Sequence, residues 1–269
     1  AAGLPLPRLR TDSPGASPDR PAAPCRAARG RPHPAPAPPR HPRGRVVRAA
    51  AGTGRVPQES RYIAVEGAIG VGKTSLARAL AKHYGARLIG EPVEENPFLP
   101  RFYEEPDRWA LTAQLSFLVE RFRQQEELVQ MDLFQQSVVT DYLFAKDRLF
   151  ARMTLGADEF ALYERIYSML HARVRKPDLV VFLDAEVEVL MRRLKKRDRP
   201  YERKVGRVYI EKVVEAYRRF FHGYRDTPLL IISCSDIDFV ENGGQLVDLV
   251  REIESMGQGV QVYVPLGSE

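Results

Sequence analysis

The chain has 269 residues, of which 44% are hydrophobic and 28% charged, a composition typical of globular proteins rather than of disordered or fibrous chains. No run approaches the roughly 18 consecutive apolar residues of a membrane-spanning helix, so we expect no membrane segment. Cys25 and Cys234, the two cysteines, have neither metal-ligand spacing nor a disulfide pattern, which favours a reducing compartment and predicts a cytoplasmic protein.

The net charge of +6 comes from the first 60 residues, which hold eleven Arg and no Lys against three acidic residues, whereas residues 61–269 hold 30 basic and 32 acidic ones. Thirteen of the 21 prolines also lie before residue 60. Such a segment cannot bury enough apolar surface to offset its ordering entropy. We expect a disordered tail over 1–58 and a folded domain over 59–269, and we infer no nucleic-acid partner from the charge.

Three interpretations of this tail stay open. An organelle-targeting peptide is Arg-rich and acid-poor, as here, and would place the protein in an organelle matrix, but such peptides are usually Ser-rich and amphipathic. A basic arm would contact anionic surfaces. A linker would have no function of its own.

The first predicted elements of the folded domain are a strand over 62–65 and a helix over 75–84, separated by a phosphate-binding pattern, GxxxxGK[ST], at 67–74. Glycines allow the backbone N–H groups to surround phosphates at the positive end of a helix, a lysine reaches the β and γ oxygens, and a hydroxyl serves Mg²⁺. The alternative is a glycine turn with a chance lysine. The pattern predicts an ATP site formed by Gly67, Ala68, Ile69, Gly70, Val71, Gly72, Lys73, Thr74 and Ser75, with Thr74 on the metal.

A short strand over 86–90 comes next, and Glu91 follows it. In an open parallel sheet, ligands bind beyond the carboxyl ends of the strands, which would place Glu91 near the phosphate loop. A carboxylate there could accept a proton from an attacking hydroxyl. A solvated acidic loop is an equally good interpretation of this residue alone.

A helix is predicted by the apolar stripe Leu111, Leu115, Leu118 and Phe122. Gln114 and Arg121 are seven residues apart and therefore point the same way along the edge of that stripe. An amide and a guanidinium projecting together could bind a planar heterocycle, although spacing alone favours ordinary flanking residues.

A buried strand over 136–140 ends at Asp141, where an acid facing the phosphate loop can help to hold Mg²⁺. Helical sequence continues over 144–150 and 160–173. The continuous apolar run 179–183 predicts a strand covered on both faces, as in parallel sheets. A further helix over 186–194, an amphipathic helix around 213–221, a strand over 229–232 and a helix over 245–253 complete an α/β three-layer fold with a parallel five-stranded sheet.

The run of basic residues from Arg192 to Lys204 is usually the sign of a solvated helix face. After a strand and a helix of a phosphate-loop protein, however, it is also where a mobile lid would lie. Arg193, Arg197 and Arg199 could then stabilise the charge on a transferring phosphoryl group.

Taken together, these motifs resemble those of the deoxynucleoside kinases that act on deoxyguanosine, deoxyadenosine and deoxycytidine. The resemblance covers about residues 61–255, and its most specific matches are 63–67, 91–93 and 103–109. It implies a P-loop kinase fold with an arginine-rich lid, ATP and Mg²⁺ as cofactors, a homodimer, and transfer of the γ-phosphoryl group to the 5′-hydroxyl of a deoxynucleoside.

The resemblance also implies residue roles. Glu91 would be the general base, Gln114 and Arg121 would bind the base with Asp147 as a candidate partner of Arg121, and Tyr103 and Glu202 would bind the sugar 3′-hydroxyl. Lys73 and the three lid arginines would act on the phosphates. Many members have Arg-Ser after the acid at position 141, where this chain has Tyr142-Leu143, so an arginine near the phosphates is missing. Bacterial purine-type members often share the Asp-Tyr pair.

Two other functions are compatible with parts of the pattern. A nucleoside monophosphate kinase such as thymidylate kinase shares the loop and lid, but Glu91 suits a neutral acceptor better than an anionic one. A non-catalytic binding or assembly subunit would be expected to lose the phosphate loop or Glu91, and both are intact.

Overall fold

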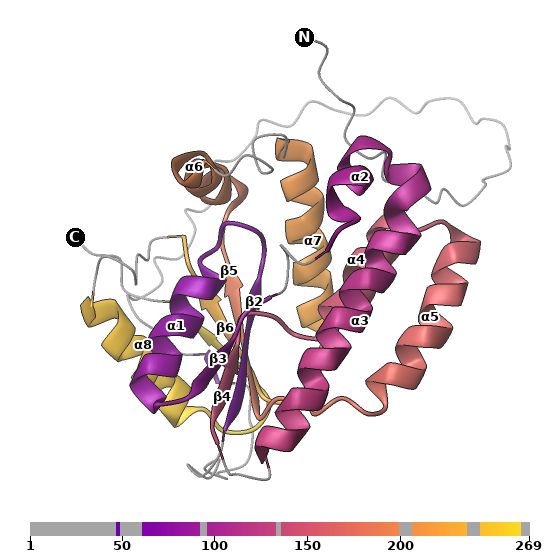
Figure 1. The fold of residues 1–269 in the computed structure, drawn as a ribbon. Helices are drawn as coiled ribbons and strands as arrows, with labels where there is room; N and C mark the ends of the chain where they lie inside the picture. Colours follow the sequence, from indigo (N-terminus) through magenta and orange to yellow (C-terminus); the bar gives the residue numbers. More distant parts are fainter. Residues whose placement is uncertain are drawn as a thin grey trace, which may run out of the picture.

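The computed structural model describes residues 47–48, 61–91, 96–132, 136–198, 206–235 and 243–264. A sheet lies at the centre, and its strand order in the described part of the chain is β1-β7-β6-β5-β2-β4-β3 (Figure 1). β1 (Val47–Arg48) pairs antiparallel with β7. The remaining six strands are parallel: β2 (Tyr62–Gly67), β3 (Arg87–Ile89), β4 (Val138–Thr140), β5 (Leu179–Asp184), β6 (Leu229–Ser233) and β7 (Val260–Tyr263).

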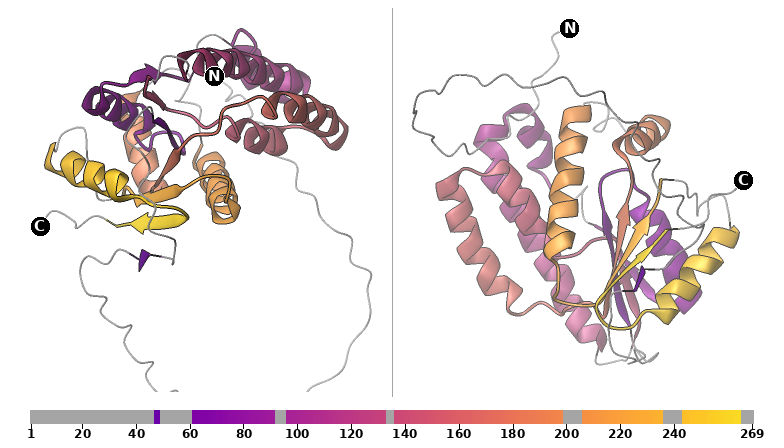
Figure 2. Two further views of the ribbon diagram at one scale, coloured as in Figure 1. Left: turned by 90° about the horizontal axis from the view of Figure 1, so that it is seen from below. Right: turned by 180° about the vertical axis from the view of Figure 1, so that it is seen from behind.

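Helices cover both faces of the sheet and give the expected three layers (Figures 1 and 2). α1 (Lys73–Tyr84) and α8 (Gly243–Ser255) lie on one side. The other side carries α3 (Pro106–Asp132), α4 (Lys146–Thr154), α5 (Ala157–His171) and α7 (Arg207–Gly223). α6 (Val187–Arg197) lies beyond the carboxyl ends of the strands, close to the loop that follows β2, and α2 (Leu99–Glu104) packs against α3.

The central strands are buried on both faces, as is typical of parallel sheets. All six residues of β2 and the first five of β5 are buried, so these two neighbouring strands need an apolar cover on both faces. One core cluster joins the sheet to α1, α6, α7 and α8. A second cluster joins α2, α3, α4 and α5 through residues such as Leu118, Phe144 and Tyr163, and it holds α3 and α5 together.

One expectation about the sheet needs correction. The five-stranded sheet is wrong by one parallel strand, because β7 was not predicted: it is four residues long and alternates apolar with polar side chains at an edge of the parallel set. Of the tail expected over 1–58, only Val47 and Arg48 are described, and they form β1. The rest of that tail lies outside the described residues.

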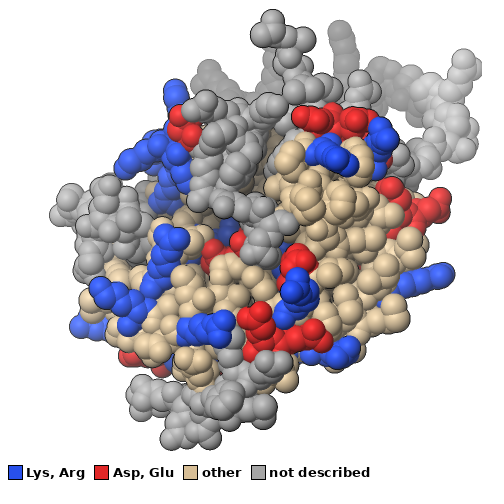
Figure 3. Space-filling model, viewed as in Figure 1, with Lys and Arg blue, Asp and Glu red and all other residues tan. Residues whose placement is uncertain are grey.

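The surface carries both signs of charge. Basic and acidic side chains are interspersed over the face shown in Figure 3. Among the described residues, no helix has the length and apolar character needed to cross a membrane.

Candidate active site

The loop between β2 and α1 has the backbone conformation that its glycines predict. Gly67, Gly70 and Gly72 have φ angles of +152°, +84° and +109°, values that side-chain-bearing residues rarely adopt. A Cβ atom at Gly67 would also lie 2.5 Å from the carbonyl oxygen of Leu183 on the neighbouring strand β5. The loop can therefore form only with glycine at position 67.

Lys73, the first residue of α1, folds back over this loop. Its Nζ donates hydrogen bonds to the carbonyl oxygens of Gly67, at 2.8 Å, and Ala68, at 3.3 Å. Burial and the nearby positive charge of Lys146 lower the pKa of Lys73, while acidic neighbours oppose the shift. The loop thus has an ammonium group at its centre, where a phosphate chain would need one.

Arg193 approaches the same loop from α6. Its guanidinium donates to the carbonyl oxygen of Val71, at 3.1 Å, and to that of Cys234 beyond β6, at 3.0 Å. The structure therefore places Arg193 beside the phosphate loop, where two backbone carbonyl oxygens hold its guanidinium. Arg197 is the last residue of α6 and is exposed, and Arg199 lies outside the described residues.

Asp141 connects the phosphate loop to the end of β3. It directly follows β4, and its Oδ2 accepts a hydrogen bond from the Thr74 hydroxyl at 2.6 Å. Its Oδ1 accepts the backbone N–H of Glu91, also at 2.6 Å. The carboxyl ends of β2, β3 and β4 therefore meet, as predicted. The Asp141 carboxylate after β4 links Thr74, which follows β2, to Glu91, which follows β3.

Glu91 lies among cations. Its Oε1 is 2.9 Å from Nζ of Lys146 and also accepts a hydrogen bond from the Arg121 guanidinium, and its side chain is 18% exposed. Burial alone would raise the pKa of Glu91, but the charges of Lys146, Arg121 and Lys73 outweigh it and hold this pKa well below the usual range. The carboxylate is therefore ionised at neutral pH.

Arg121 and Asp147 form the pair that the family resemblance implied. Both are buried, and the second guanidinium nitrogen of Arg121 contacts Asp147 in the first turn of α4. Gln114 is buried two turns earlier on α3. Tyr103 lies in α2, but its side chain is not described, and Glu202 lies outside the described residues.

Lys146 is a charged residue of this site that sequence reasoning did not identify. Glu66 is a second charged residue close to it. Glu66 is completely buried on β2, and it accepts hydrogen bonds from its neighbour Gly67 N–H, from Leu143 N–H and from the Tyr217 hydroxyl. The signal that could have identified Lys146 is the missing arginine after Asp141, which leaves a site with acidic groups short of one cation.

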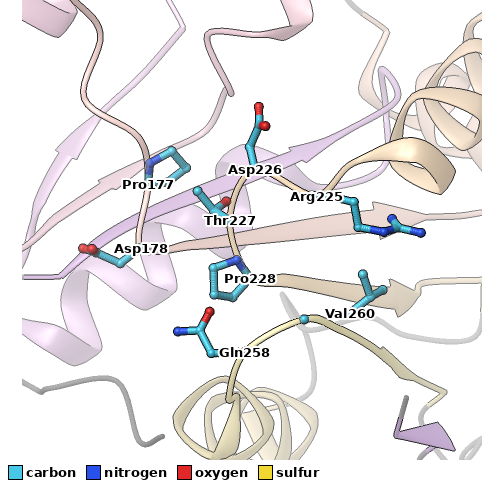
Figure 4. A pocket seen from close by; sticks show the side chains of 9 residues that line it. Pro177, Asp178, Arg225, Asp226, Thr227, Pro228, Gln258 and Val260 are labelled. Carbon is cyan, nitrogen blue, oxygen red and sulfur yellow. The ribbon is translucent and has the colours of Figure 1, made fainter. Parts of the chain in front are cut away.

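A cavity elsewhere in the molecule does not compete with this site. It has a volume of about 310 Å³ and lies where β5, β6 and β7 begin, at the opposite end of the sheet (Figure 4). Its Asp178 already accepts a hydrogen bond from Tyr62 N–H. Asp178, Arg225 and Asp226 point in different directions in Figure 4, so no set of polar groups converges on a ligand.

Comparison with known proteins points to one family. The family profile described as deoxynucleoside kinase matches residues 63–257. The deoxyguanosine kinase of Bacillus subtilis (strain 168) is 30% identical over 200 residues, which are 72% of this chain and 97% of the relative. The deoxyadenosine kinase of Dictyostelium discoideum is 31% identical over 213 residues, 77% of this chain and 85% of the relative.

A solved structure has the same fold. The deoxyadenosine kinase from M. mycoides with bound dCTP superposes with a TM-score of 0.61 at 21% identity, covering 72% of this chain and all of that protein.

Proposed function

The chain belongs to the deoxynucleoside kinase family, and we propose that it transfers the γ-phosphoryl group of ATP to the 5′-hydroxyl of a purine deoxynucleoside or deoxycytidine. The observation that carries the proposal is the position of Glu91. Its backbone N–H is bonded to Asp141, whose other oxygen is bonded to Thr74 at the phosphate loop. Glu91, with its ionised carboxylate, is thus linked through a single residue, Asp141, to the site for the triphosphate.

Different residues bind the triphosphate and the deoxynucleoside. We assign the triphosphate to residues 67–75, where backbone N–H groups and Lys73 balance its charge, and to Arg193, Arg197 and Arg199 as lid arginines. We assign the base to Gln114, Arg121 and Asp147, and the sugar to Tyr103 and Glu202. Burial of the Arg121–Asp147 pair supports the assignment, because buried charged groups of this kind recognise planar hydrogen-bonding ligands.

Glu91 orients the acceptor hydroxyl and receives its proton. Phosphoryl transfer passes through a loose transition state in which the nucleophile carries little charge until the transfer is advanced. A carboxylate with a strongly lowered pKa is a weak base, and it therefore contributes mainly by holding the hydroxyl in line. The proton moves to Glu91 late in the transfer.

The residues present fit a magnesium ion. A hydroxyl and a carboxylate oxygen lie 2.6 Å apart in Thr74 and Asp141, and oxygen groups of this kind are the ligands that Mg²⁺ prefers. When bound with the triphosphate, Mg²⁺ supplies positive charge that offsets the phosphate oxygens.

We also propose that the kinase domain spans residues 59–269 and works as a homodimer in the cytoplasm. The family match over 63–257 supports the domain limits. Exposed apolar side chains on the adjacent helices α3 and α5 support the dimer: Val119, Val129, Leu162 and Met169. Size-exclusion chromatography with light scattering tests it, and a single-chain mass at micromolar concentration would contradict it.

A comparison of acceptors tests the proposed reaction. The full chain is incubated with Mg²⁺-ATP and either deoxyguanosine, deoxyadenosine, deoxycytidine or dTMP. We expect phosphorylation of at least one nucleoside and none of dTMP. Phosphorylation of dTMP alone would contradict the proposal and favour a nucleoside monophosphate kinase.

A further inference from the structure

Lys146 occupies an unfavourable position for a lysine. It is the first residue of α4, where the helix dipole is positive, and its side chain is only 5% exposed. A cation at a helix N-terminus is destabilised by the dipole, and burying an ammonium group costs several kcal/mol unless it is paired. The stability of α4 therefore gives no reason for a lysine here.

The compensation for this cost lies in the candidate active site. Nζ of Lys146 is 2.9 Å from Oε1 of Glu91 and 4.0 Å from Oε1 of Glu66. Glu66 is itself fixed by two backbone N–H groups and the Tyr217 hydroxyl. The ammonium group is consequently held between a rigid carboxylate on β2 and the carboxylate that we assign to the acceptor hydroxyl.

The second cation at Glu91 does not make Lys146 redundant. Arg121 divides its guanidinium between Glu91 and the buried Asp147. Lys73 is engaged with carbonyl oxygens of the phosphate loop. Without Lys146, Glu91 would depend on a guanidinium that it shares with Asp147.

We propose that Lys146 is the positioning residue of this site: its ammonium, held between Glu66 and Glu91, keeps the Glu91 carboxylate directed at the acceptor hydroxyl. The inference rests on the proposed kinase function. It adds a residue whose action passes through Glu91 rather than through direct contact with the substrate.

The charged groups around Glu91 come from several helices and strands. Cations come from α1, α3 and α4, and acids from β2, from the end of β4 and from α4. They are Lys73, Arg121 and Lys146, with Glu66, Asp141 and Asp147, and the neutral Tyr217 hydroxyl on α7 completes the set.

The test compares two substitutions at this position. Lys146→Met keeps an unbranched side chain of nearly the same length and removes its charge, whereas Lys146→Arg keeps the charge. Lys82→Met, at an exposed position of α1, is the matched control. For each full-length variant, kcat and KM for the best deoxynucleoside are measured at pH 7.5, so that loss of catalysis is separated from loss of nucleoside binding.

We expect Lys146→Met to lower kcat at pH 7.5 by at least about tenfold, with a much smaller change in KM for the nucleoside. Lys146→Arg, which keeps a cation beside Glu91, should restore most of kcat, and Lys82→Met should match wild type in both constants.

Two results would overturn the inference. One is a Lys146→Met variant with the kcat of wild type. The other is an equal loss of kcat in Lys146→Met and Lys146→Arg, which would indicate a packing role rather than a role of the charge. An inactive wild-type protein would instead contradict the proposed function, so the two failures are distinguishable.

Discussion

The hydroxyl of Thr74 donates a hydrogen bond to the carboxylate of Asp141 over 2.6 Å, although the two residues belong to different strand–loop units of the sheet. This contact places two oxygen ligands side by side at the start of α1. It supports the assignment of both residues to the magnesium ion.

Removing the Thr74 hydroxyl should weaken the binding of Mg²⁺. Thr74→Val preserves the shape of the side chain but removes a ligand, so we expect the Mg²⁺ concentration for half-maximal rate to rise by about tenfold or more. Thr74→Ser keeps the hydroxyl and is the control. Titration of the rate with Mg²⁺ at fixed ATP gives both values, and equal values for the two variants would contradict the assignment.

Removing the charge of Glu91 should stop most turnover. Glu91→Gln keeps the side-chain shape and its contacts to the surrounding cations but cannot take up the proton, and we expect kcat to fall by about 10²–10⁴-fold. Lys73→Ala should have a similar effect through loss of the positive charge at the phosphates. Steady-state assays check both variants, and near-normal activity of Glu91→Gln would contradict its role.

Glu91 should also contribute to stability in a pH-dependent way. Its pKa in the folded protein is held below that of the unfolded chain, so its ionised form stabilises the fold above the ordinary Glu pKa of about 4.3 and this contribution is lost as the pH falls further. We expect Glu91→Gln to lower Tm at pH 7 and to differ less from wild type near pH 3.5. A difference in Tm that grows at low pH would contradict the sign.

The buried hydroxyl of Tyr217 offers a test of the Glu66 network. It donates to Oε1 of Glu66 at 3.0 Å, and Tyr217→Phe should destabilise the protein by about 1–2 kcal/mol because a buried carboxylate loses a donor. Tyr163 is equally buried, and its hydroxyl has no hydrogen-bond partner in the described part of the chain, so Tyr163→Phe should be neutral or stabilising. Denaturant unfolding compares them, and equal losses would show that the bond to Glu66 contributes nothing.

The sequence predicted those parts of the site that depend on local patterns. Residues 67–74 carry their signal within a single loop, and Asp141 could be placed because it ends an apolar strand whose carboxyl end must meet that loop. The pairing of Arg121 with Asp147 came only from the family resemblance, since helical spacing alone favoured ordinary flanking positions.

Lys146 was missed because its partners are remote in the sequence. The missing arginine after Asp141 indicates that the site lacks a cation, but no local pattern shows that α4 brings Lys146 to Glu91 and Glu66. Similarly, β7 is short and lies at the edge of the parallel set, where weak apolar alternation gives little signal. Helix packing decides the first case and strand pairing the second, and both are properties of the folded chain.

Product formation from the four deoxynucleosides tests the central claim most directly. The full-length protein is incubated with Mg²⁺-ATP and each deoxynucleoside in turn, and the products are separated and identified by mass spectrometry and by ³¹P NMR. We expect a 5′-monophosphate of deoxyguanosine, deoxyadenosine or deoxycytidine, formed with one ADP per product. Binding of Mg²⁺-ATP without phosphorylation of any deoxynucleoside would contradict the account.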